Sequence, residues 1–382
     1  MAGIYIHIPF CKQACYYCDF HFSTSLKKKE LLIDCLENEI SLRVPELQGE
    51  IVETIYFGGG TPSLLSQQEI NQIIETIYKQ YQVISNPEIT LEANPDDLSL
   101  EKIVELSQSK INRLSIGVQS FFERDLKLMN RAHNAQEAKE SLAIASRYFQ
   151  NISLDLIYGI PHLTNEEWRE NIDTALSFGV PHISSYALTV EPKTALASFI
   201  QKGIIAEVND EQAQEQFHIL IEELSKAGFI HYELSNFGKK GFFSKNNAAY
   251  WKGVSYLGIG PSAHSFDGKQ RSWNVRNNSK YIHAIQQNKL PIERELLSRT
   301  DQYNEYIMTG LRTIWGVDLE KVQQDFGRKY YDYLLLQSEK HRSENLLFIE
   351  QNKLKTTQKG KFLSDGIASD LFMLNLYSHS ED

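Results

Sequence analysis

Short apolar runs and amphipathic stretches alternate over the first half of the chain. Each run is rich in Ile, Val, Leu or Tyr and is typical of a buried strand, at residues 3–8, 53–57, 88–92, 113–118, 153–158 and 182–188. Between them, apolar side chains recur at helical spacing, at residues 28–43, 67–81, 100–107, 121–129, 135–148 and 165–178. Because parallel strands need crossover helices, this pattern predicts an α/β fold with a parallel sheet and helices outside it.

The number of βα units bears on whether the sheet closes. Six units are fewer than the eight of a complete TIM-type barrel, so we expect a partial (β/α)6 barrel, with a flat open sheet as the alternative. In either fold, ligands gather beyond the C-terminal ends of the strands. Glycine and polar residues do follow those ends, at residues 58–62, 92–95, 119–120, 159–161 and 191–192.

The alternation weakens after residue 192. The pattern predicts a helix at 210–227, a strand at 231–237, helices at 300–315, 319–326 and 330–340, a strand pair at 346–351 and 353–357, and a last helix at 359–372. We therefore expect a partial barrel at residues 1–210 and an extension that completes the core at 211–294. Residues 295–382 should form a helical, winged-helix-like module.

Composition narrows the classes of function. The net charge is −10, from 39 basic and 49 acidic residues, which argues against a broad nucleic-acid surface. No run of ~18 apolar residues and no signal peptide stand out, so we expect a cytoplasmic protein whose cysteines stay reduced. The lysines at 27–29 are typical of a solvated helix start, or of a peripheral contact with an anionic membrane. The oligomeric state is left open.

Three of the four cysteines, Cys11, Cys15 and Cys18, fall within eight residues directly behind the first strand. Thiolates spaced this closely can turn toward one metal centre, whereas a disulfide would leave one of them over. One interpretation is zinc, with His7 or His21 as the fourth ligand. The other is a 4Fe-4S cluster with one iron free for a further ligand.

The spacing C-x3-C-x2-C, with an aromatic residue before the last cysteine, resembles the cluster loop of the radical S-adenosylmethionine (SAM) family. Further stretches at 5–11, 58–62, 92–95, 117–119 and 155–161 resemble, in order, oxygen-independent coproporphyrinogen III oxidase and its relatives. The resemblance implies that Cys11, Cys15 and Cys18 hold a 4Fe-4S cluster. It implies SAM contacts for Tyr5, Gly59 and Glu92, and positions that touch a second SAM in the oxidase for Tyr17, Gly60, Thr61, Gln119, Arg131, Asp155 and Ala187.

Two departures separate this chain from the oxidase. The oxidase has a fourth cysteine two residues after the third, where this chain has Phe20, and it has a longer N-terminal extension. Both differences are typical of the HemW branch of the family, whose members are haem chaperones. The resemblance then implies three cofactors, namely a 4Fe-4S cluster, SAM and haem, and transfer of haem to acceptor proteins of the respiratory chain.

The haem chaperones typically carry a His-Asn-x-x-Tyr-Trp motif, and here the matching segment has Asn246 in place of the histidine. An amide is a poor axial ligand for haem iron. The resemblance leaves Asn247, Tyr250 and Trp251 as haem-site residues, and the two rings can stack on a porphyrin. His264 is a substitute ligand, with His7 and His21 as further alternatives.

An enzyme remains the alternative to a chaperone. In the oxidase, the reduced cluster cleaves SAM, and a 5′-deoxyadenosyl radical abstracts hydrogen from a propionate side chain of a porphyrinogen. A third hypothesis is another radical SAM enzyme that acts on haem or a different tetrapyrrole.

Overall fold

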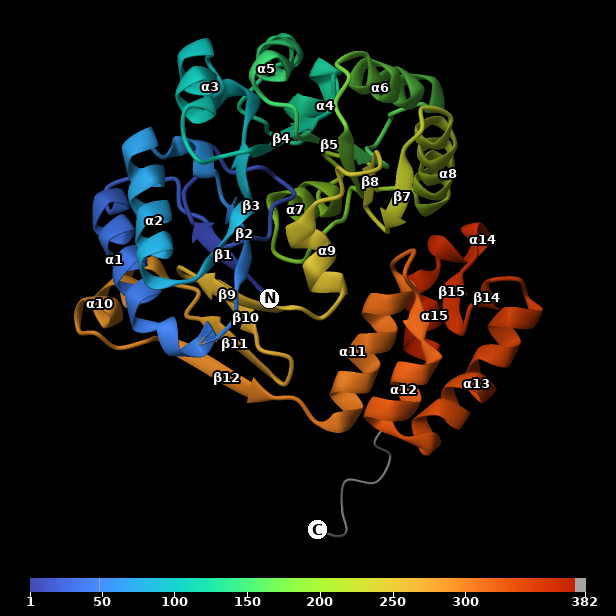
Figure 1. The fold of residues 1–382 in the computed structure, drawn as a ribbon. Helices are drawn as coiled ribbons and strands as arrows, with labels where there is room; N and C mark the ends of the chain where they lie inside the picture. The colour runs from blue at the N-terminus through green and yellow to red at the C-terminus, as the bar shows by residue number, and fades with distance from the viewer. Residues whose placement is uncertain (48, 375–382) are drawn as a thin grey trace.

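The computed structural model describes residues 1–47 and 49–374 of the 382. The six predicted βα strands are present, in the predicted order, and helices cover the outer face of their sheet (Figure 1). The strands are β1 (Ala2–Ile8), β2 (Val52–Gly59), β3 (Val83–Ala93), β4 (Arg113–Gln119), β5 (Ile152–Tyr158) and β6 (His182–Ala187). The predicted α/β fold with a partial barrel is therefore confirmed.

Strand pairing explains why the cysteine loop and the glycine run lie side by side. In the part of the chain that the structure describes, the sheet has 12 strands, in the order β12-β11-β10-β9-β1-β2-β3-β4-β5-β6-β8-β7. Strands β1 to β6 are parallel neighbours, and Ile8 at the end of β1 pairs with Gly59 at the end of β2. Loops that follow these strands consequently emerge at one edge of the sheet.

Capping interactions between nearby residues define where several of the covering helices begin, close to the predicted starts. Three of them begin with a capping box, in which Ser66, Asn134 and Thr164 each pair with a glutamate three residues on. The helices of the barrel are α1 (Lys29–Leu42), α2 (Gln67–Gln80), α3 (Leu100–Ser107), α4 (Glu123–Leu128), α5 (Ala135–Tyr148), α6 (Asn165–Ser177) and α7 (Ala195–Gln201). Single 3-10 turns lie at Val44–Leu47, Pro62–Leu64 and Pro95–Asp97.

The segment after β6 adds strands to both ends of the sheet. The predicted helix is α8 (Asp210–Lys226), but the single strand predicted at 231–237 is a hairpin of β7 (Ile230–Glu233) and β8 (Asn236–Gly238). The remaining elements are α9 (Lys245–Trp251), β9 (Ser255–Ile259), β10 (His264–Phe266), β11 (Gln270–Asn274), α10 (Asn278–Gln286) and β12 (Ile292–Leu296). Strand β9 runs parallel to β1, with Tyr256 opposite Gly3.

The C-terminal module has its own small sheet and its own buried apolar cluster. Its elements are α11 (Arg299–Leu311), β13 (Val317–Asp318), α12 (Leu319–Phe326), α13 (Arg328–Ser343), β14 (Leu347–Glu350), β15 (Lys353–Thr356), α14 (Gln358–Lys361) and α15 (Ser364–Asp370). The prediction of a single helix at 359–372 is wrong, because the two short helices α14 and α15 occupy that stretch. Gly360 lies so close to the Leu346 carbonyl that a Cβ there would be 2.2 Å from its oxygen. The part of the predicted module at residues 375–382 lies outside the described residues.

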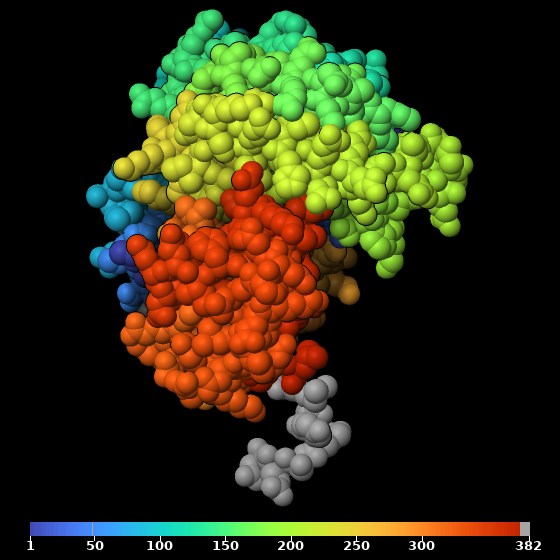
Figure 2. Space-filling view, turned by 90° about the vertical axis from the view of Figure 1, so that its right-hand side faces the viewer, coloured from blue at the N-terminus to red at the C-terminus, as the bar shows by residue number. Residues whose placement is uncertain are grey.

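The module lies beside α9 and follows β12, away from α3 and α5 (Figure 1), and its surface meets that of the barrel in Figure 2. Contacts join the two parts around α9: Arg312 lies over the Trp251 ring at 5.5 Å, and Lys252 over the Trp315 ring at 4.3 Å. These cation–π pairs link one helix of the barrel to the end of α11. Within residues 1–47 and 49–374, no helix combines the length and the apolar character needed to cross a membrane.

Candidate functional site at the C-terminal edge of the barrel

The cysteine loop follows β1 and is tied to two other loops of the same edge. The Cys11 N–H donates to the Ser23 carbonyl at 3.1 Å, which closes the loop at its base. The Tyr16 N–H donates to the Met129 carbonyl at 3.1 Å, and the Tyr16 carbonyl accepts from the Leu196 N–H at 2.8 Å. The loop is therefore held between the segments that follow β4 and β6.

The three cysteines of this loop are free thiols and only half-buried. Burial raises the pKa of the Cys11 thiol to about 11, and a hydrogen bond with Thr61 opposes part of that rise. The neighbouring cysteines raise it further, since thiolates that lie close together repel each other. A bound metal would reverse this preference, because metal ligation requires the thiolate.

The histidines proposed as a fourth zinc ligand are engaged elsewhere. His7 Nε2 lies 3.0 Å from the His21 carbonyl oxygen, and its Nδ1 lies 3.3 Å from the Tyr5 hydroxyl. His21 Nε2 is 2.6 Å from Asn278 Oδ1. Among the described residues, no group of His, Cys, Asp or Glu side chains is arranged to hold a single metal ion. With His7 and His21 engaged, a zinc ion on this loop would lack a histidine as its fourth ligand, whereas a cubane held by three thiolates needs none.

Arg131 connects the cysteine loop to the strand ends. Its Nη1 donates to Cys15 Sγ at 3.3 Å and to the Tyr17 hydroxyl at 3.4 Å. Its Nη2 donates to Asn94 Oδ1 at 2.7 Å and to the Gly117 carbonyl at 2.8 Å. The guanidinium thus brings positive charge to the sulfurs. Asn94 in turn donates to the Thr61 hydroxyl at 3.2 Å, so Thr61 lies in the same network.

The glycine run after β2 leaves room for its neighbours. Gly59 has φ +107°, and a Cβ on it would lie 2.5 Å from the His7 ring. A Cβ on Gly60 would lie 2.6 Å from the Phe10 carbonyl oxygen. The Gly59 N–H donates to Glu92 Oε2 at 3.1 Å, which fixes the glutamate at the next strand end. Side chains larger than hydrogen would therefore displace β1 or the cysteine loop.

Two carboxyl groups, those of Glu92 and Asp155, face the interior of the barrel. Burial raises the pKa of Glu92 to about 7, while its hydrogen bond from Tyr56 at 2.8 Å opposes the shift. Burial raises the pKa of Asp155 to about 6, and the buried Arg113 guanidinium opposes that shift. Each carboxyl group is therefore poised between charged and neutral forms, with room for hydrogen bonding to a polar ligand.

The other residues assigned by resemblance also lie at this edge. Tyr5 stacks on Tyr56 with ring centroids 6.0 Å apart. Gln119 ends β4 in a left-handed conformation, with φ 70° and 8% of its surface exposed. Ala187 ends β6 opposite Tyr158 on β5. These residues come together at one edge, and their roles toward SAM stay predictions.

Three residues of the site were not among the sequence-based assignments: Tyr56, Asn94 and Tyr186. Tyr186 is 44% exposed, yet burial and the nearby Asp155 raise its phenol pKa well above the usual value, so its exposed surface faces the barrel interior. Strand alternation could have indicated two of them. Tyr56 lies two residues before Gly58, and Tyr186 lies two residues after Ser184, on the inward face in each case.

The residues assigned to haem lie on two elements, α9 and β10. Asn247 is at the start of α9, where its N–H donates to the Ser244 hydroxyl at 3.3 Å. Tyr250 and Trp251 line a cavity between the barrel and the C-terminal module. His264 is exposed on β10, with its ring 6.0 Å from that of Trp273, and is not among the residues that line the cavity.

Asn246, at the position of the motif histidine, is buried and hydrogen-bonded within the fold. It is 3% exposed, and its Oδ1 accepts a hydrogen bond from the Thr54 hydroxyl at 3.1 Å. The Glu88 carboxylate accepts the N–H groups of Lys245 and Asn246 at 3.1 Å each, at the start of α9. The helix therefore closes the N-terminal end of the barrel. The Tyr250 phenol further along α9 interacts electrostatically with Tyr5 and Glu92.

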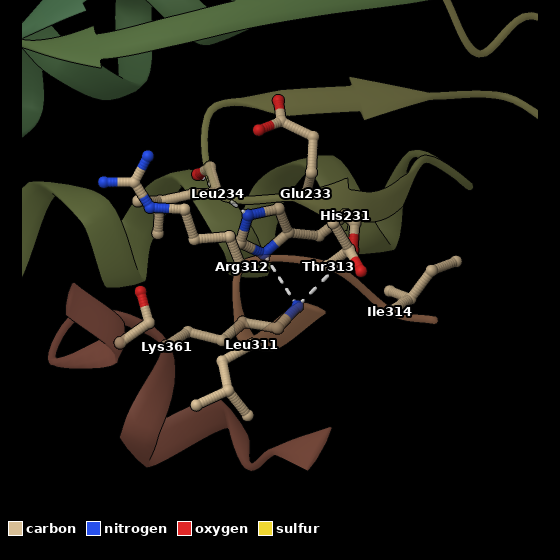
Figure 3. Close-up of a pocket in the computed structure, with 9 residues that line it drawn as sticks. His231, Glu233, Leu234, Leu311, Arg312, Thr313, Ile314 and Lys361 are labelled. Atoms are coloured by element: carbon tan, nitrogen blue, oxygen red, sulfur yellow. Dashed lines mark hydrogen bonds between the residues drawn. The ribbon is translucent and has the colours of Figure 1, made fainter. Parts of the chain in front are cut away.

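A small pocket at the junction with the C-terminal module holds a second group of buried titratable side chains (Figure 3). Lys361 Nζ lies 2.9 Å from His231 Nδ1, and burial lowers the pKa of the lysine to about 8. Burial raises the pKa of Glu233, two residues on, to about 7. The pocket volume is only about 10 Å³, so these groups join two parts of the chain without leaving space for an organic ligand.

Comparison with known proteins assigns the chain to a family. The radical SAM superfamily model matches residues 5–175, and the HemN C-terminal domain model matches residues 297–363. The haem chaperone HemW of Bacillus subtilis strain 168 is 35% identical over 373 residues, which cover 96% of this chain and 98% of the relative. HemW of Lactococcus lactis subsp. lactis strain IL1403 is 33% identical over 364 residues, 95% of each chain.

A solved structure has the same fold. The radical SAM coproporphyrinogen III oxidase HemN of Escherichia coli matches with a TM-score of 0.84 at 23% identity, over 97% of this chain and 90% of that one. Since the identity to the HemW proteins holds over nearly their whole length and the cysteine loop lies at the matching strand ends, this chain belongs to the HemW family of the radical SAM superfamily.

Proposed function

We propose that this protein is a haem chaperone that holds a 4Fe-4S cluster and SAM at the C-terminal edge of the barrel and binds haem reversibly. Membership of the HemW family supports the proposal, because the relatives named above are haem chaperones. The fold alone does not separate a chaperone from the oxidase HemN, which shares it. The distinction depends on the residues around the cysteine loop.

In this proposal, Cys11, Cys15 and Cys18 hold the cluster. Three free thiols on one loop, an Arg131 hydrogen bond to a sulfur and the engaged histidines fit three-thiolate ligation. Bound together, a cluster and SAM supply one-electron reductive chemistry. The chain's own part is to orient SAM: Tyr5, Gly59 and Glu92 surround its position, and Tyr17, Gly60, Thr61, Gln119, Arg131, Asp155 and Ala187 extend the polar surface.

The observation that favours a chaperone over an oxidase is Phe20. It stands two residues after Cys18, where the oxidase has a fourth cysteine, and 73% of its surface is exposed. An exposed aromatic ring cannot bind iron as a thiolate would. The alternative, a coproporphyrinogen III oxidase or another radical SAM enzyme acting on a tetrapyrrole, draws support from the retained carboxyl groups of Glu92 and Asp155.

Haem transfer to acceptor proteins of the respiratory chain completes the proposal. The acceptors lie at a membrane, and the exposed Lys27 is the member of the lysine run best placed to contact it peripherally. Lys28 donates to Ser279 and Lys29 pairs with Glu69, each at 2.8 Å. A cytoplasmic location fits free thiols, which need a reducing compartment.

Two assays on anaerobically reconstituted full-length protein test the proposal. We expect haem titration to develop a saturable absorption spectrum, and we expect the bound haem to move to an added apo-acceptor. We also expect no conversion of coproporphyrinogen III in the presence of SAM and a reductant. Conversion of the porphyrinogen would establish the enzyme instead, and a titration that shows only free haem would rule out the chaperone.

A further inference from the structure

A cavity of about 740 Å³ lies between the barrel and the C-terminal module. One wall comes from α9 and the strands β9 to β11, and the other from α11 and α12. Tyr256 in its wall pairs with Gly3 near the start of β1. The cavity therefore lies toward the start of β1, whereas the cysteine loop follows the end of that strand.

The cavity has aromatic rings on both walls, together with four carboxyl groups and three cationic side chains. Tyr250, Trp251, Tyr256 and Phe266 contribute rings from the barrel side, and Tyr306 and Phe326 contribute rings from the module. The volume is within the range of small-molecule and cofactor sites. Rings on opposite walls can stack on the two faces of one planar molecule. A tetrapyrrole has this shape, and its carboxylates need cations nearby.

A cation is available on the barrel wall. Arg271 on β11 lines the cavity and forms an ion pair with Glu305 of α11, which lines it from the other side. The pair bridges the two walls and leaves the guanidinium 46% exposed. A propionate can take the place of Glu305 on this guanidinium, which would free the module wall from the barrel wall at that point.

Because Asn246 replaces the histidine of the motif, the ligand to haem iron must be a side chain other than that histidine. Among the described residues that line the cavity there is no histidine or cysteine. A tyrosine ligand would have to lose its proton, and burial raises the phenol pKa of Tyr250, Tyr256 and Tyr306 above the usual value. Met308 on α11 also lines the cavity, and a thioether binds haem iron without losing a proton.

We propose that haem binds in this cavity between α9 and α11, and that the sulfur of Met308 is the protein ligand to its iron. The inference rests on the proposed function and adds the location and the ligand. It divides the site between the two parts of the chain, because the stacking rings come mainly from the barrel and the iron ligand comes from the module. His264 then has no role in ligation, since it lies outside the cavity.

The test compares haem titrations of the full-length wild-type protein with those of Met308→Leu and Met308→His. Leucine keeps the volume of methionine but removes the sulfur. We expect Met308→Leu to lose the thioether-to-iron charge-transfer band of the ferric complex and to bind haem roughly tenfold or more weakly. Met308→His should restore affinity with the spectrum of an imidazole ligand.

Two controls keep the outcome specific. Met373→Leu makes the same change at a buried methionine of the module that does not line the cavity, and it should leave both affinity and spectrum unchanged. His264→Ala should also leave them unchanged. Urea unfolding of each variant, compared with that of the wild type, separates loss of the ligand from loss of the fold.

The outcomes distinguish this inference from the proposed function. A wild-type protein that does not bind haem overturns both. A wild-type protein that binds haem, together with a Met308→Leu variant of unchanged spectrum and affinity, overturns the inference and leaves the chaperone proposal standing. Loss of binding in His264→Ala with retention in Met308→Leu would also overturn it and would assign the ligand to β10.

Discussion

The guanidinium of Arg131 donates a hydrogen bond to the Cys15 sulfur at 3.3 Å, although the two residues lie 116 positions apart in the chain. A positive charge and a hydrogen bond at a cluster sulfur stabilise the more negative, reduced state. We expect Arg131→Met to lower the reduction potential of the reconstituted cluster by on the order of tens of millivolts. Redox titration followed by electron paramagnetic resonance measures the shift. Arg147→Met, an exposed position on α5, is the control and should leave the potential unchanged; an unchanged potential in Arg131→Met would refute this role.

The cysteines can be tested against one another. We expect Cys15→Ala to abolish the brown absorbance of the anaerobically reconstituted protein, because two thiolates do not hold a cubane. Cys35→Ala should retain the absorbance, since Cys35 is 3% exposed and its sulfur faces the Ile282 carbonyl at 3.9 Å. Iron and sulfide analysis of both variants provides the measurement. A cluster that persists in Cys15→Ala would show that the ligands are assigned wrongly.

Gly59 is expected to tolerate no side chain. A Cβ would lie 2.5 Å from the His7 ring, and the residue has φ +107°, so Gly59→Ala combines a steric clash with backbone strain. We expect a loss of roughly 2–4 kcal/mol in the free energy of unfolding, together with weaker SAM binding. Gly366→Ala is the matched control, because a Cβ there would meet nothing within 4 Å and the residue is in a helix. Urea unfolding and calorimetric SAM titration would detect both effects, and equal stabilities of the two variants would contradict the clash.

Asn246 is expected to support the fold without binding haem. Its Oδ1 accepts a hydrogen bond from Thr54, which is 3% exposed, so Asn246→Ala leaves that hydroxyl buried without its acceptor. We expect a loss of about 1–3 kcal/mol in the free energy of unfolding and an unchanged haem affinity in the folded protein. Haem titration beside urea unfolding checks both. A variant of unchanged stability that no longer binds haem would give Asn246 the ligand role that its position in the motif suggests.

The junction pocket predicts a dependence of stability on pH. The pKa of Glu233 is raised by burial from 4.5 to about 7, so the folded state binds more protons than the unfolded state between these values. Stability should therefore fall as the pH rises through that window, by at most about 3 kcal/mol, and then level off. We expect Glu233→Gln to remove this dependence, so that it is more stable than the wild type near about pH 8 but not near about pH 5.

Glu339→Gln is the control for that measurement, because Glu339 is exposed on α13. Urea unfolding across the pH window gives the free energies for all three proteins. A wild-type curve that rises through the window would contradict the raised pKa. Lys361 contributes in the opposite direction at higher pH, because burial lowers its pKa to about 8 and the unfolded chain regains the proton.

The strands and helices of the barrel could be predicted from the sequence because the patterns that define them lie within short segments of the chain. Each strand from β1 to β6 is a short apolar run, and each covering helix has an apolar face and often a capping box within a few residues. The pairing of β9 with β1 carried no such signal. It joins Tyr256 to Gly3 across most of the chain, and only the folded sheet brings them together. The hairpin of β7 and β8 was missed because its strands are too short for a periodic pattern.

The site residues likewise fall into those that a local motif reveals and those that only the folded chain brings together. Three cysteines within one loop are visible in any window of the sequence. Tyr186 and Asn94 are ordinary residues until the sheet turns them toward the carboxyl groups and Arg131. The separation of His264 from Trp251 was also beyond sequence reasoning, because it depends on the direction in which β10 leaves the cavity wall.

Tyr250 belongs to two neighbourhoods at once, since it lines the cavity and its phenol interacts electrostatically with Tyr5 and Glu92. This one side chain therefore lies between the cavity beside the module and the proposed SAM site. If SAM and haem bind as proposed, thermodynamic linkage requires that SAM change the dissociation constant of haem by the same factor by which haem changes that of SAM. One coupling energy, measured from either side, would then describe both SAM binding and haem release.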